Sequence, residues 1–227
     1  MPVKINKGTL YRSLKELHFE DMPNLEIWLT SPVTDHKDKE PDLFKFPVLK
    51  TVTVTECPML TPQPCLPDAI ADLSVSGSSS MLSVGRIAVP PSSLLRRLWI
   101  KNCHVSSNEW RLLRHRPKLE DLVIEYCERL HVLPEAIRSL TNLRRLKILN
   151  CRELKALPEW LGELATLESL EIRCCPKLVS LPKGLQGLTA LEELTVTGCS
   201  PDLNERCTKA TGRDWFKICH VPSIIVS

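Results

Sequence analysis

The sequence contains no long hydrophobic run. Nowhere do about eighteen apolar residues follow one another, the length at which a membrane-spanning helix is suspected. Residues 1–8 include no apolar stretch of signal-peptide length, and no Asn-x-Ser/Thr sequon occurs in the chain. We therefore expect a cytoplasmic protein that has no membrane partner.

Motifs of catalytic and metal sites are also missing. Glycine is scarce, with 8 in 227 residues, and there is no Gly-x-x-x-x-Gly-Lys-Ser/Thr, Gly-x-Gly-x-x-Gly, His-Glu-x-x-His or Gly-x-Ser-x-Gly motif. The ten cysteines include no Cys-x-x-Cys pair, and the six histidines are scattered without acidic partners in sequence. We expect no catalytic residue, no metal, no cofactor and no small-molecule substrate, so the protein is not expected to be an enzyme.

Charge of one sign is not concentrated in any block. The net charge is +3, and 25% of the residues are charged, with both signs mixed. Nucleic acids and anionic membranes attract runs of basic residues. Neither is therefore favoured as a partner.

What the sequence does contain is a fixed spacing. Leu-x-x-Leu-x-Ile/Val recurs every 24 residues, and a Cys follows eight residues after each first Leu; those leucines are Leu95, Leu119, Leu143, Leu167 and Leu191. This is the signature of a leucine-rich repeat, in which each unit adds one short strand beside that of its neighbour. The spacing predicts an α/β solenoid shaped as a curved horseshoe, with a parallel β-sheet on the concave face and short helices and loops on the convex face.

About eight units are predicted over residues 1–202, the first three beginning at Leu14, Leu49 and Ile70. In three later units the strand is followed by Leu-Pro, so short helices are expected at 135–140, 159–164 and 183–188. The first half is less regular. A charged insertion at 36–40 is expected to be a loop, prolines after Cys57 are expected to exclude a helix, and nothing before Leu14 is expected to cap the first unit.

The periodic cysteines invite a metal or redox interpretation. Six of them share the repeat position that usually holds a buried Asn or Cys, namely Cys57, Cys103, Cys127, Cys151, Cys175 and Cys199. We expect these thiols to be small buried groups and weak donors. Cys174 precedes the periodic position and is expected to be more exposed, which leaves a reactive thiol open there.

The outward positions of the predicted strands form the remaining candidate site, and we call this surface the outer sheet face. It carries apolar or aromatic side chains at Trp99, Val123, Tyr126 and Leu149, near basic residues of the same units. The candidate protein-binding residues are Arg97, Trp99, Lys101, Asp121, Val123, Glu125, Tyr126, Arg145, Lys147 and Leu149.

Two interpretations of these residues remain open. The charges can pair between neighbouring strands, as Lys101 with Glu125 and Lys147 with Glu171, and merely keep the sheet soluble. Alternatively, the exposed aromatic residues anchor a protein partner.

The end of the chain resembles a known family. Leu203-Asn204-Glu205-Arg206-Cys207, followed by Gly212-Arg213-Asp214-Trp215 and a run through Lys217-Ile218 to His220-Val221-Pro222, is similar to the closing segment of plant nucleotide-binding leucine-rich-repeat (NB-LRR) disease-resistance proteins. Met22-Pro23-Asn24-Leu25 is similar to their repeats. Residues 203–227 are expected to cap the solenoid, with Trp215, Phe216, Ile218 and Val221 covering its apolar end.

The resemblance implies a function in plant defence. The chain is expected to be a non-catalytic recognition and regulatory module, whose protein partner is a pathogen effector, a host protein or a nucleotide-binding module. Because the phosphate loop of that module is missing, we expect a fragment or truncated gene product that binds no nucleotide. The alternative is a structural scaffold that organises host signalling partners.

Overall fold

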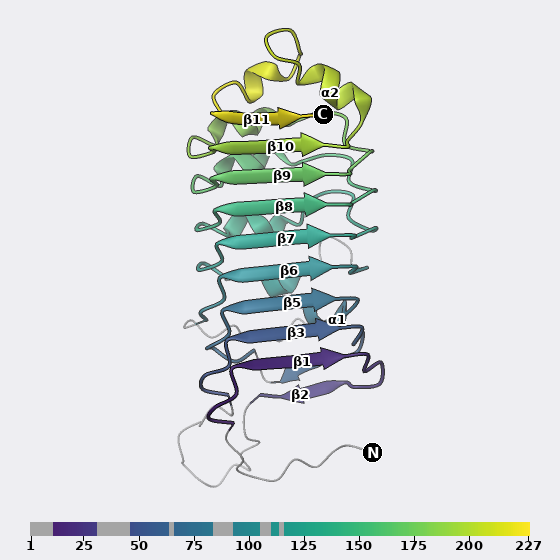
Figure 1. Cartoon of the computed structure of the whole chain (residues 1–227), viewed down its shortest axis with the longest axis vertical. Coiled ribbons are helices and arrows are strands. Elements are labelled where there is room, and N and C mark those ends of the chain that lie inside the picture. The colour runs from purple at the N-terminus through teal and green to yellow at the C-terminus, as the bar shows by residue number, and fades with distance from the viewer. Residues whose placement is uncertain (1–10, 31–45, 64–65, 84–92, 105–109, 114–115) are drawn as a thin grey trace.

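The computed structural model describes residues 11–30, 46–63, 66–83, 93–104, 110–113 and 116–227. In these residues nine parallel strands form one sheet, stacked in chain order from the N-terminal to the C-terminal end (Figure 1). They are β1 (Glu16–Glu20), β3 (Thr51–Thr55), β5 (Asp72–Ser76), β6 (Arg97–Lys101), β7 (Asp121–Glu125), β8 (Arg145–Leu149), β9 (Ser169–Arg173), β10 (Glu193–Thr197) and β11 (Ser223–Val226). The predicted solenoid of stacked strands is confirmed.

The repeat spacing fixes the register of the sheet. Each repeat leucine pairs with its equivalent in the next unit, as Leu98 with Leu122 and Leu122 with Leu146. Inward positions are buried and outward positions are not, which is the alternation of a sheet with one covered face. A branched residue at the second inward position, such as Ile124, suits a strand packed on one side.

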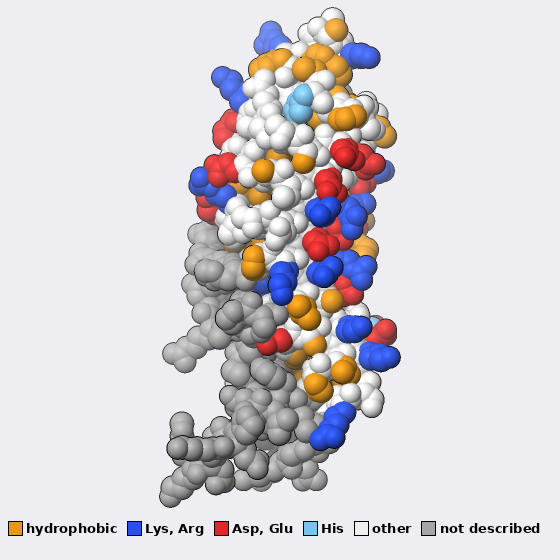
Figure 2. Space-filling model, turned by 90° about the vertical axis from the view of Figure 1, so that its left-hand side faces the viewer, with side chains coloured by type: hydrophobic (Ala, Val, Ile, Leu, Met, Phe, Trp, Pro, Cys, Tyr) orange, Lys and Arg blue, Asp and Glu red, His pale blue; other side chains and the backbone are white. Residues whose placement is uncertain are grey.

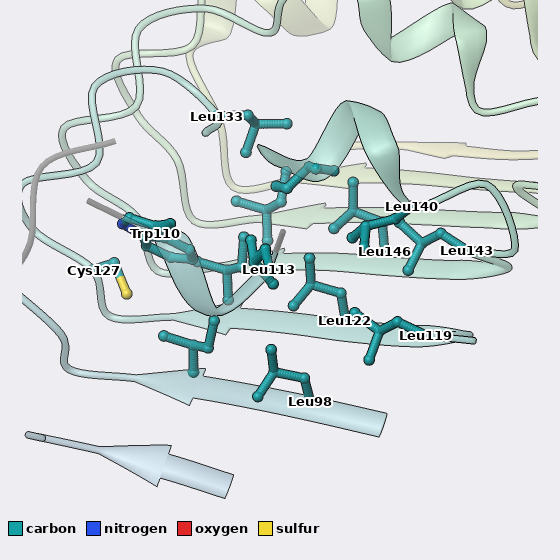
Figure 3. Packing of buried hydrophobic residues seen from close by; sticks show 14 of the residues in the cluster. Leu98, Trp110, Leu113, Leu119, Leu122, Cys127, Leu133, Leu140, Leu143 and Leu146 are labelled. Atoms are coloured by element: carbon teal, nitrogen blue, oxygen red, sulfur yellow. The ribbon is translucent and has the colours of Figure 1, made fainter. Parts of the chain in front are cut away.

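Leucine side chains from successive units form one continuous core behind the sheet. Figure 3 shows Leu122 and Leu146 pointing from their strands into this layer, where Leu140 meets them from the helical side. All three side chains are fully buried. Full burial of a leucine contributes roughly 1.5–3 kcal/mol, and no single unit could achieve it alone.

Short helical turns cover the other side of the core. The expected helices are short 3-10 helices, η3 (Glu135–Ser139), η4 (Glu159–Glu163) and η5 (Lys183–Gly187), with a further one at η2 (Arg111–Leu113). Pro134, Pro158 and Pro182 are the residues before the turns rather than their first residues. Proline fixes the entry to each turn without needing a backbone donor.

The buried interpretation of the periodic cysteines is confirmed. Five of the six are fully buried and Cys199 is half-buried, and each thiol donates to the carbonyl oxygen two residues before it. Burial raises the pKa of Cys151 to about 12. Ser78 occupies the same position in the unit that begins at Ile70 and donates in the same way, at 2.9 Å. These groups close the turns after β3 and after β5 to β10.

The N-terminal half contains elements that the spacing did not predict. β2 (Ile27–Leu29) and β4 (Thr61–Gln63) pair as a small second parallel sheet, and α1 (Ser80–Ser83) follows β5. The prolines after Cys57 were expected only to exclude a helix, whereas Thr61–Gln63 forms a strand. The charged insertion at 36–40 lies outside the described residues.

The first unit was expected to be bare, and among the described residues it is not. Tyr11 stacks on Phe46, with ring centroids 5.3 Å apart, and Trp28 packs against both Phe46 and Phe19. Trp28 and Phe46 are buried, although Phe19 and the other inward residue of β1, Leu17, are only half-buried. An aromatic cluster therefore lies beside the edge strand.

The C-terminal segment contains α2 (Pro201–Arg206), η6 (Trp215–Lys217) and β11. β11 continues the sheet. The backbone N–H of Gly198 donates to the carbonyl oxygen of Ser227, directly after β11. The equivalent residue of each earlier unit donates in the same way to the end of the next strand of this sheet. Ile218 and Val221 are buried against the core, as expected, and Trp215 is half-buried. Phe216 is half exposed to solvent, so its expected covering role is wrong; its ring is turned outward near Lys217.

A buried ion cluster holds this segment to Leu181, in the repeat that begins at Leu167. The carboxylate of Asp214 is 1% exposed, accepts two hydrogen bonds of 3.0 Å from Arg206, and lies 2.7 Å from the Lys217 ammonium. It also accepts a hydrogen bond from the backbone N–H of Leu181 at 3.0 Å. Burial disfavours the charged carboxylate, yet the hydrogen bonds from Arg206 and Lys217 prevail and lower the pKa of Asp214.

Candidate functional site

Nine of the ten predicted site residues lie on three neighbouring strands, β6, β7 and β8. They form three rows across the sheet in exact register, and Tyr126 directly follows β7. The rows are Arg97–Asp121–Arg145, Trp99–Val123–Lys147 and Lys101–Glu125–Leu149. The structure thus gathers all ten residues on one part of the outer sheet face.

Ion pairs link the rows from strand to strand. Arg145 donates to both carboxylate oxygens of Asp121, at 2.6 and 2.7 Å, and Lys147 lies 2.7 Å from Glu171. Lys101 lies 3.7 Å from Glu125. The two lateral pairs expected from the sequence, Lys101 with Glu125 and Lys147 with Glu171, are confirmed.

Arg97 does not pair with Asp121 in its own set of strands. Its Nε and Nη2 donate instead to Asp72 on β5, the latter at 2.8 Å. The hydrogen bonds and charge of the partner carboxylates raise the pKa of both Arg97 and Arg145, so both guanidinium groups remain charged. Asp72 is therefore a site residue that the sequence-based list omitted, although its place in the register was visible.

Basic and acidic side chains differ in depth on this surface. In the Lys and Arg pairs of the outer sheet face, the carboxylate side chains are 16 to 26% exposed and the basic ones 43 to 66%. Figure 2, which faces the ends at which the strands begin, shows the two signs interleaved along one side of the molecule. A molecule approaching the sheet consequently meets the cationic groups first.

Trp99 is the most exposed aromatic residue of the site. The residue is 50% exposed, and its neighbours in the row are Ser74 on β5 and Val123 on β7. Because Ser74 is small, the surface beside the indole stays open. A hollow of about 380 Å³ lies there, lined in part by Thr51, Asp72, Ser74, Arg97, Trp99, Asp121, Val123, Arg145 and Lys147.

The hollow divides the predicted site. Arg97, Trp99, Asp121, Val123, Arg145 and Lys147 line it, whereas Lys101, Glu125, Tyr126 and Leu149 lie toward the ends of the strands, outside it. Thr51 and Ser74 belong to the hollow but were not predicted as site residues. Their small side chains gave no signal of binding in the sequence.

Tyr126 adds a second exposed aromatic ring at the end of β7. It is 42% exposed, and the Lys101 ammonium lies 5.4 Å from its ring centroid. Its φ of 52° is left-handed, as is φ at the same turn in every unit, where the other residues are Asp21, Glu56, Gly77, Asn102, Asn150, Cys174 and Gly198. Bulky side chains disfavour this conformation, which Gly and Asn tolerate best. The turn geometry directs an aromatic side chain outward at some cost in stability.

The described residues hold no cluster of three or more His, Cys, Asp or Glu side chains suited to a metal ion. Cys174 is exposed, as expected for its turn position, and Cys219 is exposed as well. No helix in the described part of the chain is long and apolar enough to span a bilayer.

Solved structures with the same architecture support the repeat assignment. A leucine-rich-repeat (LRR) protein of Leptospira interrogans is similar over 71% of this chain, with 20% identity and a TM-score of 0.51. The LRR domain of the type III effector XopL is similar over 93% of the chain, with 17% identity and a TM-score of 0.51. The fold is a leucine-rich-repeat solenoid.

A third solved structure is also similar to this LRR solenoid. TLR13, in a complex with ssRNA13, is similar over 80% of the chain, with 16% identity and a TM-score of 0.52. The chain spans 40% of the Leptospira protein, 76% of the XopL domain and 29% of TLR13. At these identities the likeness concerns the fold alone.

A family model points to one class of LRR sequence. The model described as R13L1/DRL21 LRRs matches residues 110–175 and 135–199. These ranges contain β7 to β10 and therefore much of the candidate site. No curated protein matches the chain in a sequence search.

Proposed function

We propose that this LRR solenoid is a non-catalytic protein-recognition module that binds its partner on the outer sheet face. The observation that carries the proposal is Trp99, an indole half exposed at the wall of a hollow, with Arg97, Arg145 and Lys147 around it. Tryptophan, tyrosine and arginine are the residues most enriched at binding hot spots. Ion pairs link the charged side chains around Trp99 and keep the sheet soluble, whereas an exposed indole adds nothing to solubility.

The biological setting that we propose is an intracellular immune receptor of plants. The match to the R13L1/DRL21 LRR model and the closing segment around Asp214 both support this setting. The partner would be a pathogen effector, a host protein or a nucleotide-binding module that the solenoid restrains. No cofactor enters the proposal.

A pull-down with matched variants tests the binding surface. The chain carrying Trp99→Ser and Tyr126→Asn is compared with wild type and with Val179→Ser, which removes an exposed apolar side chain outside the outer sheet face. Proteins from infected and uninfected plant tissue that bind wild type and Val179→Ser, but not the double variant, support the proposal. Partners retained by the double variant would overturn it.

Co-expression with a nucleotide-binding module separates the receptor from a structural scaffold that organises host partners. The extensive lateral ion pairing of the outer sheet face is what favours a scaffold as the second candidate. A receptor module is expected to form a stable complex that silences signalling. Host partners bound equally well without such a module favour the scaffold.

A further inference from the structure

We infer that the partner segment bound beside Trp99 is acidic: an extended stretch of protein in which carboxylates flank one aromatic or large aliphatic side chain. This inference rests on the proposed function and names the chemistry of its partner. It stands on the distribution of charge, on the orientation of two guanidinium groups, and on the shape of the hollow.

Positive charge is concentrated in the three units that contain the site. These units, residues 95–166, include 14 Lys and Arg and 9 Asp and Glu, a net charge of +5, whereas the whole chain carries +3. The remainder of the chain therefore carries −2. Long-range attraction directs an acidic partner toward these units rather than toward either end of the solenoid.

The recessed carboxylates orient the basic groups above them. Asp72 and Asp121 each accept from Nε and Nη2 of one arginine, which are two of its five N–H donors. The residues that the structure describes accept no further hydrogen bond from Arg97 or Arg145. Both guanidinium groups are held in place before a partner arrives, so less conformational entropy is lost on binding.

The spacing of the two arginines suits an extended peptide. Arg97 and Arg145 lie in one row with Asp121 between them, so their backbones are two strands, or roughly 10 Å, apart. In a polyproline-II segment, which has three residues per turn and rises about 3.1 Å per residue, acidic residues three positions apart point to the same side and span roughly 9 Å. A side chain between them then faces Trp99 and Val123 in the adjacent row.

The hollow has room for that side chain. Its volume is about 380 Å³, and a cavity of roughly 150 Å³ already holds a benzene ring. Val123 and the exposed indole supply an apolar wall, and Lys147 also lines the hollow. An aromatic residue flanked by carboxylates matches these surroundings in both shape and charge.

A nucleic acid fits the same surface less well. Duplex DNA presents one charge per 1.7 Å or so of its axis and requires basic groups whose charge is not already matched. Here Arg97, Arg145 and Lys147 each lie against a carboxylate of the sheet. Two or three carboxylates of a peptide can accept hydrogen bonds from the remaining N–H donors of these basic residues. A continuous array of phosphates would also lie against the acidic side chains of the sheet and be repelled by them.

Binding of short synthetic peptides to the full chain, measured by fluorescence anisotropy, tests the inference. The probes are a Glu/Phe peptide, a Glu/Ser peptide, a Lys/Phe peptide and oligo-dT. The Glu/Phe peptide is expected to bind best, and its affinity is expected to fall as salt rises, because exposed charges are screened. Equal binding of the Lys/Phe peptide, tighter binding of oligo-dT, or no binding of any peptide at millimolar concentration would overturn the inference.

Variants then locate the interaction. Trp99→Ser is expected to weaken the Glu/Phe peptide about thirtyfold, and Arg97→Gln with Arg145→Gln about tenfold or more. Arg138→Gln, which removes an arginine paired with Glu163 on the helical side, is the matched control and is expected to change nothing. The double variant Arg97→Lys with Arg145→Lys keeps the positive charges but loses the planar guanidinium groups. It is expected to weaken binding less than the double glutamine variant does.

The outcomes separate this inference from the proposed function. Peptides that bind at Trp99 regardless of their charge refute the acidic partner and leave the recognition surface intact. If neither the peptides nor the partners from plant tissue depend on Trp99, the proposed function itself is wrong. Unchanged affinity in the glutamine double variant refutes the role of the two arginines.

Discussion

The carboxylate of Asp214 lies 2.7 Å from the ammonium of Lys217, and both side chains are almost fully buried. A buried charge that loses its partner is costly, because nothing replaces its lost hydration. This pair belongs to the segment that covers the last repeats, where Asp214 also accepts from the backbone of Leu181. The stability of the C-terminal end therefore depends in part on a few buried polar contacts.

Asp214→Asn is expected to destabilise the protein by about 3–5 kcal/mol, since Lys217 would remain buried without a counter-charge. Chemical denaturation followed by circular dichroism measures the loss. Asp202→Asn, an exposed residue of α2 in the same segment, is the control and is expected to cost less than about 1 kcal/mol. Equal losses in the two variants would contradict the role of the buried pair.

Stability is expected to fall in acid. The folded state lowers the pKa of Glu171 and Asp214 from their ordinary values of 4.5 and 3.8. Although burial opposes ionisation of Glu171, hydrogen bonds from Lys147 and Arg173 prevail. A lowered pKa contributes stability above the ordinary value, and this contribution is lost as the pH falls through the folded pKa. The free energy of unfolding should therefore decrease below about pH 4.5, and less steeply in Glu171→Gln.

Much of this architecture could be predicted from the sequence because one register repeats. A 24-residue period places Leu98, Leu122 and Leu146 in one row, and every outward residue follows from that alignment. β11 was missed because Ser223–Val226 lies outside the repeat and carries no Leu-x-x-Leu pattern. The pairing of Thr61–Gln63 with Ile27–Leu29 was missed because it joins segments more than 30 residues apart, with a proline in one strand.

The candidate site was predictable only in part. The rows of charged residues could be written from the period, but the depth of each side chain could not, because it depends on rotamers and neighbours. Two features of the site depend on rotamers and neighbours in this way. Arg97 turns to Asp72, and Ser74 leaves the indole of Trp99 open. The binding role of the ten residues stays a prediction.

The buried cysteines provide a test of the turn geometry. Burial raises the pKa of Cys127, Cys151 and Cys175 to about 12, and a thiol reacts as its thiolate. With iodoacetamide at neutral pH, Cys174 and Cys219 are expected to be alkylated well before these three. Mass spectrometry of tryptic peptides gives the order, and the same reaction in denaturant provides the control. Early modification of Cys151 in the folded protein would contradict the closed turns.

Leu146→Ala and Lys147→Ala compare the two faces of one strand. Leu146 is fully buried, so its truncation leaves a cavity and is expected to cost about 2–5 kcal/mol. Lys147 faces outward and pairs with Glu171, which keeps Arg173 as a second partner, so the expected cost is about 0.2–1 kcal/mol. Urea denaturation of both variants gives the two values, and the reverse ranking would be incompatible with the register.

At Tyr126 a binding role can be told apart from a structural one. Its backbone is left-handed, so a bulky side chain at this position is a poor choice for stability. Tyr126→Asn relieves a strain of about 1 kcal/mol and loses a contact with Lys101 of roughly 0.5–1 kcal/mol, so the free energy of unfolding should change little. If Tyr126 contacts the partner, affinity nevertheless falls. The reverse exchange, Asn150→Tyr in the next unit, is expected to lower stability without restoring affinity in the Tyr126→Asn background. Unchanged affinity in Tyr126→Asn would remove Tyr126 from the recognition surface while leaving Trp99 in place.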